Sequence, residues 1–482
     1  MSILQRNIDG VVDLLSLHRK NPARYPFLLE SVARVRSSER HDGEQGNWDI
    51  LFAFPGDSIR LDCDKTATDF LNQLDADWQR ESIAAEPTQQ IPFIGGWFLY
   101  LGYELAAQIE PTLSLPETNQ LMPRALAVRC PAAVILDRDR QQTIIIAEDG
   151  YQDYLEGIGA DIDALKDLAT GYDHVSQLVS LTTLSEEMPE RFIAAIRRIK
   201  DYIRSGDVFQ VNLSRAWTGR IGNDTSAADI YAALRHCNPA PFAALCCFED
   251  WAIISSSPER LVRIDRHHYV ETRPIAGTHP RCDNPGEDRR LSQALLQHPK
   301  EQAEHIMLID MERNDLGRVC AAGTIHVDEL MVLESYTHVH HIVSNVRGRL
   351  RDGVTPGQVI RAVFPGGTIT GCPKVRCMEI IAELENAERG PYTGSVGYLN
   401  RDGSLDLNIL IRTLFLHHDT LTLRTGAGIV NDSVPERELA ETRAKACGVL
   451  TALGKSEDEL QVELGWDNVA DQWRAHDTDQ CA

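Results

Sequence analysis

The chain has 482 residues, of which 43% are hydrophobic and 25% are charged, and its formal net charge is −23. This length predicts two or three domains or one large elaborated domain, and the composition is that of a soluble globular protein. The acidic balance argues against nucleic acid and anionic membrane surfaces as partners, although a bound cation can reverse the sign of charge inside a pocket.

The eleven cysteines are scattered and include no CxxC pair. This pattern predicts reduced thiols rather than disulfides or a zinc site. The N-terminus lacks the apolar core of a signal peptide, and no uncharged apolar stretch approaches the length of a membrane span. We therefore expect a cytoplasmic protein with no membrane partner.

Residues 1–170 form an N-terminal region with predicted strands and helices of its own. Residues 130–137 and 143–147 are rich in β-branched and small apolar residues on either side of a polar turn, which predicts a hairpin. Residues 160–169 follow a helical pattern. The mixed, polar stretch at 171–187 predicts a boundary with the rest of the chain.

The middle of the chain begins with a candidate capping box from Thr183 to Glu186. Apolar residues then recur with helical period from Phe192 to Ile203, and the predicted helix ends at Ser205. Short β-rich runs follow. We expect strands at residues 209–214, 242–248, 251–255, 261–264 and 269–275.

The last third alternates helical and strand patterns without regular βαβ units. An Asp-Gly turn at 402–403 predicts a hairpin of residues 395–399 with 405–415. Residues 456–482 are acidic and polar, which predicts a loosely held tail. The whole pattern indicates an α+β fold with large antiparallel sheets. We also expect helices at 299–311, 358–363 and 375–384 and a strand at 421–425.

Two carboxylates and an ammonium share one face of a predicted helix near the C-terminus. Glu438, Glu441 and Lys445 are three and four residues apart, and the glycine-rich segment 425–430 precedes them. Carboxylates that face one point repel unless a cation or a shared proton lies between them, and Mg²⁺ is the obvious occupant. The alternative is a solvated helix face with ordinary charge pairs.

Other polar segments flanked by glycine or proline lie at the ends of predicted elements. Glycines at 366–371 allow close approach of the backbone before a helix N-terminus, which favours anions, although a structural turn explains them equally well. Gly277 and Thr278 end a predicted strand, and Glu259 follows a proline. Glu304 precedes an apolar run and a dense polar cluster that marks either an ion-pair network or a site. Active sites on rigid scaffolds are built from such segments.

Taken together, these motifs resemble the chorismate-utilising enzymes, a family that contains anthranilate synthase component I, aminodeoxychorismate synthase component I, isochorismate synthase and salicylate synthase. The resemblance is strong over residues 185–455, the expected chorismate-binding catalytic domain, and looser over 1–170. The matching segments are Gln210–Ser214, Ser257–Arg260, Arg273–Thr278, Asp310–Val319, Gly366–Lys374, Tyr392–Gly394, Thr425–Val430 and the helix with Glu438, Glu441 and Lys445.

The resemblance implies two large antiparallel β-sheets packed face to face and surrounded by helices. It implies Mg²⁺ as cofactor and chorismate as substrate. Glu304 and Glu441 would be the metal ligands, with Glu438 nearby or acting through water. His341 would lie by the leaving hydroxyl, and Glu259 would be the acid that protonates it, which requires a raised pKa.

The remaining residues implied by the resemblance bind or line the pocket. Ala276, Gly277, Thr278 and Thr368 would line it, with Thr278 offering a hydroxyl, and Tyr392, Arg412, Gly426, Gly428 and Lys445 would bind the substrate and its carboxylates.

Gln210 discriminates between branches of the family, because members that add water carry Lys at this position and members that add ammonia carry Gln. The resemblance therefore implies ammonia as nucleophile, supplied from glutamine by a separate glutamine amidotransferase subunit. Ala276 resembles anthranilate synthases, whereas many aminodeoxychorismate synthases carry Lys there. The segments Gly366–Gly371 and Trp48–Gly56 resemble aminodeoxychorismate synthases.

We favour aminodeoxychorismate synthase component I, which would serve 4-aminobenzoate and folate biosynthesis. The alternatives are anthranilate synthase component I and a non-catalytic tryptophan-binding subunit. The N-terminal region shares a candidate tryptophan-binding element with anthranilate synthases. Its candidate residues are Glu30, Ser31, Asn238, Pro239 and Phe242.

Overall fold

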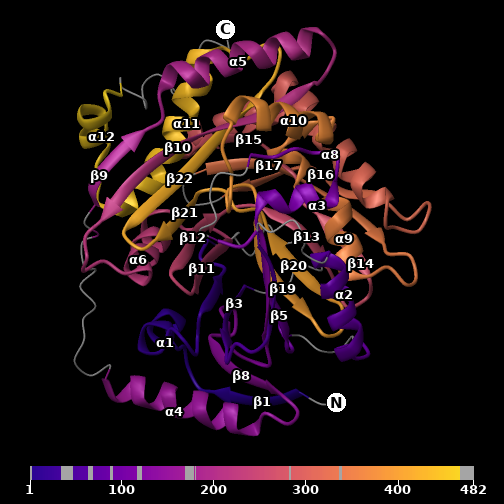
Figure 1. Ribbon diagram of the computed structural model, residues 1–482, viewed down its shortest axis with the longest axis vertical. Helices are drawn as coiled ribbons and strands as arrows, with labels where there is room; N and C mark the ends of the chain where they lie inside the picture. Colours follow the sequence, from indigo (N-terminus) through magenta and orange to yellow (C-terminus); the bar gives the residue numbers. More distant parts are fainter. Residues whose placement is uncertain are drawn as a thin grey trace.

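The structure is a computed structural model, and two antiparallel sheets dominate it (Figure 1). It describes residues 3–33, 47–62, 69–86, 91–116, 122–168, 179, 181–281, 284–335 and 339–466. No helix within these ranges combines the length and the apolar character that a membrane crossing needs.

The larger sheet has twelve strands in the described residues, in the order β1-β8-β7-β3-β2-β11-β12-β21-β22-β10-β18, with β9 also paired to β10. Its strands are β1 (Ile3–Ile8), β2 (Phe27–Glu30), β3 (Trp48–Ala53), β7 (Ala132–Asp137), β8 (Gln142–Glu148), β9 (Leu181–Glu186), β10 (Gln210–Ile221), β11 (Phe242–Phe248), β12 (Trp251–Ser257), β18 (Gly371–Cys372), β21 (Thr413–His417) and β22 (Thr420–Ile429).

The second sheet has ten strands over the same described ranges, in the order β15-β17-β14-β13-β20-β19-β5-β6-β4, with β16 also paired to β17. Its strands are β4 (Ser58–Leu61), β5 (Gly96–Leu101), β6 (Ala125–Cys130), β13 (Arg260–Ile264), β14 (Tyr269–Thr272), β15 (Ile275–Pro280), β16 (His326–Ser335), β17 (Val339–Arg349), β19 (Ser395–Asn400) and β20 (Leu405–Asn408).

Helices surround the two sheets. The α-helices are α1 (Leu14–Lys20), α2 (Phe70–Glu81), α3 (Ala106–Ile109), α4 (Gln152–Leu168), α5 (Pro189–Arg204), α6 (Ala227–Cys237), α7 (Pro285–Gln297), α8 (Pro299–Gly317), α9 (Pro356–Val363), α10 (Lys374–Glu385), α11 (Pro435–Leu450) and α12 (Glu457–Leu464). Short 3₁₀ turns are η2 (Tyr103–Leu105), η3 (Gly367–Ile369) and η4 (Thr451–Leu453).

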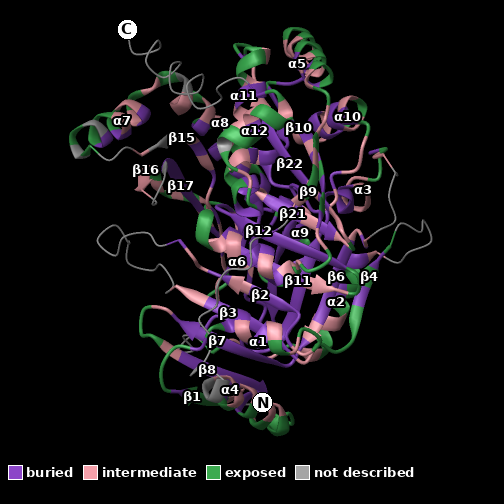
Figure 2. Ribbon diagram, turned by 90° about the vertical axis from the view of Figure 1, so that its left-hand side faces the viewer, coloured by how far each residue is buried: buried purple, intermediate pink, exposed green. Residues whose placement is uncertain are grey.

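An aromatic core holds the sheets face to face. Phe27 on the larger sheet stacks on Phe98 of the second sheet with ring centroids 3.9 Å apart, and Phe52 meets the same ring edge-on at 5.7 Å. All three rings are fully buried. Such aromatic pairs combine large apolar area with a preferred geometry. The predicted α+β fold of two packed antiparallel sheets is confirmed, and Figure 2 shows the buried strands between more exposed helices.

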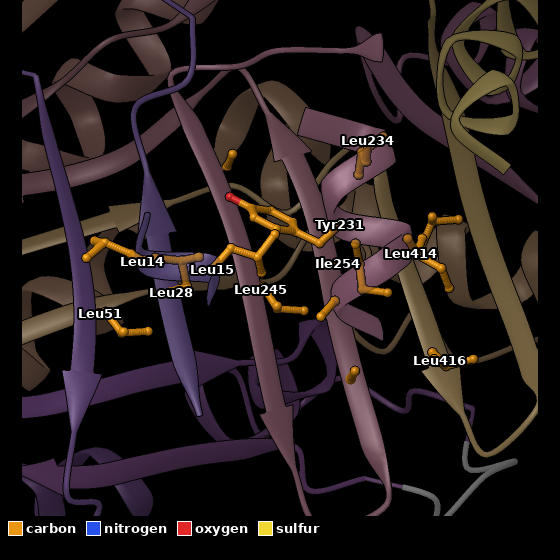
Figure 3. Packing of buried hydrophobic residues seen from close by; sticks show 14 of the residues in the cluster. Leu14, Leu15, Leu28, Leu51, Tyr231, Leu234, Leu245, Ile254, Leu414 and Leu416 are labelled. Atoms are coloured by element: carbon orange, nitrogen blue, oxygen red, sulfur yellow. The ribbon is translucent and has the colours of Figure 1, made fainter. Parts of the chain in front are cut away.

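The outer face of each sheet buries a second apolar layer under helices. Figure 3 shows Leu28, Leu245 and Leu414 from three strands of the larger sheet beneath Leu14 of α1 and Tyr231 of α6. The second sheet is covered in the same way by α2, α8 and α9. Strands buried on both faces read as continuous apolar runs, which explains the Val- and Ile-rich sequence of β7 and β8.

Residues before and after 171–187 share both sheets. β2 pairs with β11 in the larger sheet, and β5 pairs with β19 in the second. The predicted boundary therefore does not separate two sheets. The predicted hairpin after Cys130 is formed by β7 and β8. The predicted helix at 160–169 lies in α4 (Gln152–Leu168) over its described residues, and α4 begins earlier, at Gln152.

Two sequence predictions are wrong in this region. Thr183–Glu186 is part of strand β9 rather than a capping box, because Thr183 and Ser185 pair with β10. Residues 405–415 are two strands in different sheets, β20 and β21, so only β20 forms the hairpin with β19. The pattern of apolar residues could not reveal this change of sheet, because both strands are buried.

The predicted loose tail is ordered over its first part. Ser456 caps α12 with reciprocal hydrogen bonds to Glu459, and Leu460 is fully buried. Trp466 is also buried, and its indole N–H donates to Glu186 at 2.8 Å. Residues 467–482 lie outside the described residues.

A buried ion network ties α10 to the strands that carry the candidate site. Glu385 accepts hydrogen bonds from the Ser214 backbone at 2.7 Å, from Arg389 at 2.6 Å and from Arg424 at 3.0 Å. Burial alone would raise the pKa of this carboxyl, but the two guanidinium groups hold it below its usual value. The network fixes β10, β22 and the turn after α10 relative to one another.

We expect Glu385→Gln to lower the free energy of unfolding by about 3–5 kcal/mol, because it leaves the buried Arg389 and Arg424 without a counter-charge. Urea unfolding followed by circular dichroism measures the change. The control is Asp201→Asn, which removes a largely exposed ion pair with Arg204 and should cost less than about 1 kcal/mol. Equal stability of Glu385→Gln and the wild type would show that the network is not structural.

Candidate active site

The predicted site residues come from ten segments. They are Gln210 on β10, Glu259 between β12 and β13, Ala276, Gly277 and Thr278 on β15, Glu304 on α8, His341 on β17, Thr368 on η3, Tyr392 and Arg412 in the connections next to β19 and β21, Gly426 and Gly428 on β22, and Glu438, Glu441 and Lys445 on α11. Figure 1 shows β10, β22, α8, α10 and α11 in the upper half of the molecule, away from β1, β8 and α4.

One face of the β10–β22 pair is polar because side chains alternate along a strand. Val211 and Leu213 point into an apolar cluster with Ala427. The opposite face therefore presents Gln210 and Asn212, with glycines of β22 beside them. A Cβ at Gly428 would collide with the Gln210 amide, so the glycine leaves room for that amide.

Lys445 and Glu441 of α11 lie at the edge of this polar face. Lys445 Nζ donates to the Gly426 carbonyl at 2.9 Å and forms an ion pair with Glu441 at 2.7 Å. Both side chains stay partly exposed, at 41% and 38%. They share one helix face as predicted from their spacing, and the ammonium of Lys445 carries the charge that an anionic ligand would need.

Tyr392 contributes a hydroxyl to the same place. A Cβ on Gly426 would lie 2.6 Å from this hydroxyl and 2.8 Å from Asn212 Oδ1. Burial raises the pKa of Tyr392 to about 12, so the group remains a neutral hydrogen-bond donor at physiological pH. Arg389 of the ion network packs over its ring at 5.5 Å.

Glu259, the acid that the family resemblance implies, is a buried carboxyl. It lies where the chain passes from β12 of one sheet to β13 of the other, and it is 6% exposed. Thr368 donates to Glu259 Oε1 at 2.8 Å. Burial raises the pKa of this carboxyl to about 7, while Thr368 and the positive charge of Arg412 oppose the increase.

Arg412 lies on a second connection between the sheets, from β20 to β21. Its φ is 51°, a left-handed conformation that non-glycine residues rarely adopt. The two connections are hydrogen-bonded, because Ile409 N–H donates to the Glu259 carbonyl at 3.0 Å and the Ser257 hydroxyl donates to the Ile409 carbonyl at 2.5 Å. Glu259 and Arg412 are thus held together by the backbone.

His341 is buried beside them and is neutral. Burial, reinforced by the charge of Arg412, lowers the pKa of His341 to about 3. Its ring donates to the Gly277 carbonyl. β15 pairs with β17 here, with Ala276 opposite Ile342 and Thr278 opposite His341. The pairing of β15 with β17 therefore brings Ala276, Gly277 and His341 to one strand pair.

Helix α8 lies against this strand pair and carries Glu304. A Cβ on Gly277 would lie 3.0 Å from Glu301 Oε2, so the first turns of α8 approach the strand closely. Glu301 and Glu304 are three residues apart and share a helix face. Glu304 is half-buried on this helix, as Glu438 is on α11.

The donor chemistry of Glu304 and Glu441 fits Mg²⁺, which prefers oxygen ligands and is held by one or two carboxylates with substrate oxygens and water. Within the described residues, three metal-ligating groups lie within 4.8 Å of one another at Asp250, His417 and His418. This group is on two hairpin turns and has nitrogen donors, so its chemistry differs from a magnesium site.

The sequence analysis missed Glu312, which is buried on α8 next to the site. A Cβ on Gly367 would lie 3.4 Å from Glu312 Oε1. Burial and the neighbouring Asp315 raise the pKa of Glu312 above its usual value. Its signal was the spacing of Glu304, Glu312 and Asp315, eight and three residues apart on one helix face. Lys374 approaches this group through an ion pair with Asp315.

The tryptophan-site candidates also lie together. Val32 and Ala33, next to Ser31, both donate backbone hydrogen bonds to the Ala240 carbonyl, which brings the end of β2 beside the turn at 238–240. Glu30 is buried and accepts from the Tyr231 hydroxyl at 2.6 Å. The other candidates lie where β2 meets this turn. Ser31 N–H donates to Asp49, and the Asn238 side chain donates to Ser256. Pro239 is in the turn, and Phe242 begins β11 with its ring under Arg260.

The chain is 37% identical over 473 residues to anthranilate synthase component 1 of Synechocystis sp., covering 89% of this chain and 91% of that protein. It is 48% identical over 271 residues to aminodeoxychorismate synthase component 1 of Bacillus subtilis, covering 56% of this chain and 57% of that protein.

Solved structures show the same architecture. The structure of anthranilate synthase component I from Streptococcus pneumoniae matches with a TM-score of 0.74 and 29% identity, covering 86% of this chain and 95% of that one. The menaquinone-specific isochorismate synthase MenF of Escherichia coli shares the fold at 18% identity, with a TM-score of 0.69 over 94% of each chain.

A family model for chorismate binding enzymes matches residues 36–451, a span that includes every residue placed above on β10, β22, α8 and α11. The relatives include both anthranilate and aminodeoxychorismate synthases. This chain belongs to the chorismate-binding enzymes and is a chorismate-utilising member of the anthranilate and aminodeoxychorismate synthase family.

Proposed function

We propose that the chain is an aminodeoxychorismate synthase component I, which replaces the ring hydroxyl of chorismate with ammonia to form 4-amino-4-deoxychorismate. The observation that carries the ammonia assignment is Gln210. Gln210 is 8% exposed, and its side-chain amide cannot act as a base at physiological pH. The nucleophile must therefore be reactive without losing a proton first, as ammonia is and water is not.

The buried acid supports loss of the hydroxyl. Hydroxide is a poor leaving group, so its departure requires a proton in the transition state. Glu259 keeps its proton up to about pH 7 and can donate it to the leaving oxygen, which departs as water. The proton that ammonia loses after forming the carbon–nitrogen bond can return to the Glu259 carboxylate. The neutral His341 can orient the leaving hydroxyl.

Cationic and hydroxyl groups can bind the two carboxylates of chorismate. Lys445 and Arg412 supply the charges, and the Tyr392 hydroxyl supplies a neutral donor. Gly426 and Gly428 leave room on β22 for the Tyr392 hydroxyl and the Gln210 amide, which would face the substrate. Glu304 and Glu441 would hold Mg²⁺, with Glu438 acting through water. When bound, Mg²⁺ neutralises the ring carboxylate and makes the conjugated ring more electrophilic.

A separate glutamine amidotransferase subunit would supply the ammonia. The component naming of the relatives supports this arrangement. The second candidate function is anthranilate synthase component I. Ala276 on β15 favours it, since no lysine nucleophile is available there, and so do the long matches to anthranilate synthases. Tryptophan would then bind near Ser31 and Asn238.

Product analysis decides between the two candidates. We expect the protein, incubated with chorismate, Mg²⁺ and ammonium salt, to give a product that 4-amino-4-deoxychorismate lyase converts to 4-aminobenzoate. Liquid chromatography measures 4-aminobenzoate and anthranilate in the same run. Anthranilate as sole product would refute the proposal and establish the second candidate.

We expect Glu441→Gln to reduce the rate by on the order of 10³ and to remove its dependence on Mg²⁺, because a hard carboxylate ligand is lost. Steady-state rates over a range of Mg²⁺ concentrations measure this. The matched control is Glu436→Gln on the same helix, which is 64% exposed and should keep wild-type turnover. Wild-type turnover of Glu441→Gln would contradict a metal role for this residue.

The pH dependence tests Glu259. Activity needs its protonated form, so kcat/KM should fall as pH rises through about 7. Thr368→Val removes a hydrogen bond that lowers this pKa and should move the falling limb to higher pH. Glu259→Gln should lower the rate by about 10²–10⁴ without this limb.

The same raised pKa has a consequence for stability. The unfolded chain loses the Glu259 proton at lower pH than the folded protein does, so this group's stabilising contribution is complete at low pH. It is lost as pH rises through about 7. Glu259→Gln should therefore be stabilised relative to the wild type in alkaline solution. A wild-type rate profile that is flat across neutral pH would exclude Glu259 as the acid.

A further inference from the structure

The polar face of β10 carries two buried acceptors that no protein group satisfies. Among the described residues, Gln210 Oε1 and Asn212 Oδ1 are buried side-chain oxygens without a hydrogen-bond partner. Buried polar atoms are nearly always paired, and leaving one unpaired costs about 1–3 kcal/mol. Two such atoms on neighbouring positions of one strand face indicate a ligand that donates hydrogen bonds.

The backbone holds both side chains in place. Asn212 N–H donates to the Thr370 carbonyl at 2.9 Å, and its carbonyl accepts from Arg389 at 2.7 Å. The Gln210 carbonyl accepts from the Cys377 thiol at 3.0 Å, and its residue pairs with Cys372 on β18. The two amides therefore project from a strand that is fixed on both edges.

The two amides lie beside the residues that are proposed to bind chorismate. Asn212 lies opposite Gly428 in the strand pairing, and its Oδ1 and the Tyr392 hydroxyl converge above Gly426. The Gly426 carbonyl is the acceptor of Lys445. A molecule held by the two amides would thus be next to the groups proposed to bind chorismate.

The chemistry of the pair selects its ligand. Two carbonyl oxygens can accept two N–H bonds of ammonia, which leaves the nitrogen lone pair free to attack. Neither amide bears a charge, so the pair does not stabilise ammonium over neutral ammonia as a carboxylate would. A carboxylate at either position would instead stabilise ammonium, which has no lone pair.

We propose that Asn212 is an ammonia-binding residue, acting with Gln210 to hold the nucleophile above the glycines of β22. This inference rests on the proposed amination of chorismate and extends it to a residue that the Gln210 motif alone does not identify. The bond-forming step is attack of the ammonia nitrogen on the ring carbon. The ring hydroxyl leaves with the proton from Glu259.

The experiment measures the KM for ammonia and the KM for chorismate separately in Asn212→Ala, with ammonium chloride as nitrogen source at fixed pH. Loss of one hydrogen bond should raise the KM for ammonia about tenfold and leave the KM for chorismate within about twofold. Asn212→Asp should move the ammonia dependence to higher pH, because the carboxylate favours ammonium.

The matched control is Thr218→Val on the exposed part of the same strand, which should leave both constants unchanged. Thermal unfolding separates a folding defect from a binding defect, since all three variants should melt within a few degrees of the wild type. A rise in the KM for chorismate with an unchanged KM for ammonia would overturn the inference while amination itself stands. Absence of any ammonia-dependent product in the wild type would overturn both.

Discussion

The site depends on two places where the chain leaves one sheet and enters the other. The connection from β12 to β13 carries Glu259, and the connection from β20 to β21 carries Arg412. Hydrogen bonds between these connections hold an acid and a cation together inside the protein. Because each residue lies between two rigid strands, its position follows from the packing of the sheets rather than from a mobile loop.

This arrangement places ionisable side chains in a buried site and sets their protonation states. Burial raises the pKa of Glu259 to about 7, and the Thr368 hydroxyl and Arg412 limit the increase. The same burial keeps His341 neutral. Lys445 and Glu441 remain partly exposed on α11, where their ion pair is accessible to solvent. The buried ion network around Glu385 supports the polar strand face from behind.

Much of the fold could be predicted from local patterns, and the errors have physical causes. Alternation and turn signals gave the strands β11, β12 and β19, and the spacing of Phe192, Ile196 and Ile199 gave α5. The change of sheet between β20 and β21 left no local signal, because pairing is a long-range property. Thr183 resembled a cap because Ser and Thr suit both helix N-termini and edge strands.

Some residues of the candidate site could likewise be predicted from the sequence, and others could not. Glu441 and Lys445 could be placed on one helix face from their spacing alone, and Gln210 and the glycines of β22 were accessible as motifs. The helical spacing of Glu312 could be read from the sequence, but its burial and the unpaired acceptor of Asn212 are properties of the folded chain. Sequence motifs thus identified the groups that resemble the family, and the structure added the neighbours that surround them.

The central proposal is that these segments form one chorismate site whose affinity would depend on a cation held by carboxylates of α8 and α11. Isothermal titration of chorismate into Glu259→Gln, which should bind without turnover, tests it most directly when performed with and without Mg²⁺. We predict a single site per chain that binds at least tenfold more tightly with Mg²⁺, as expected when a metal neutralises a substrate carboxylate. Binding that is absent, or that is equally tight in a chelator, would contradict the account.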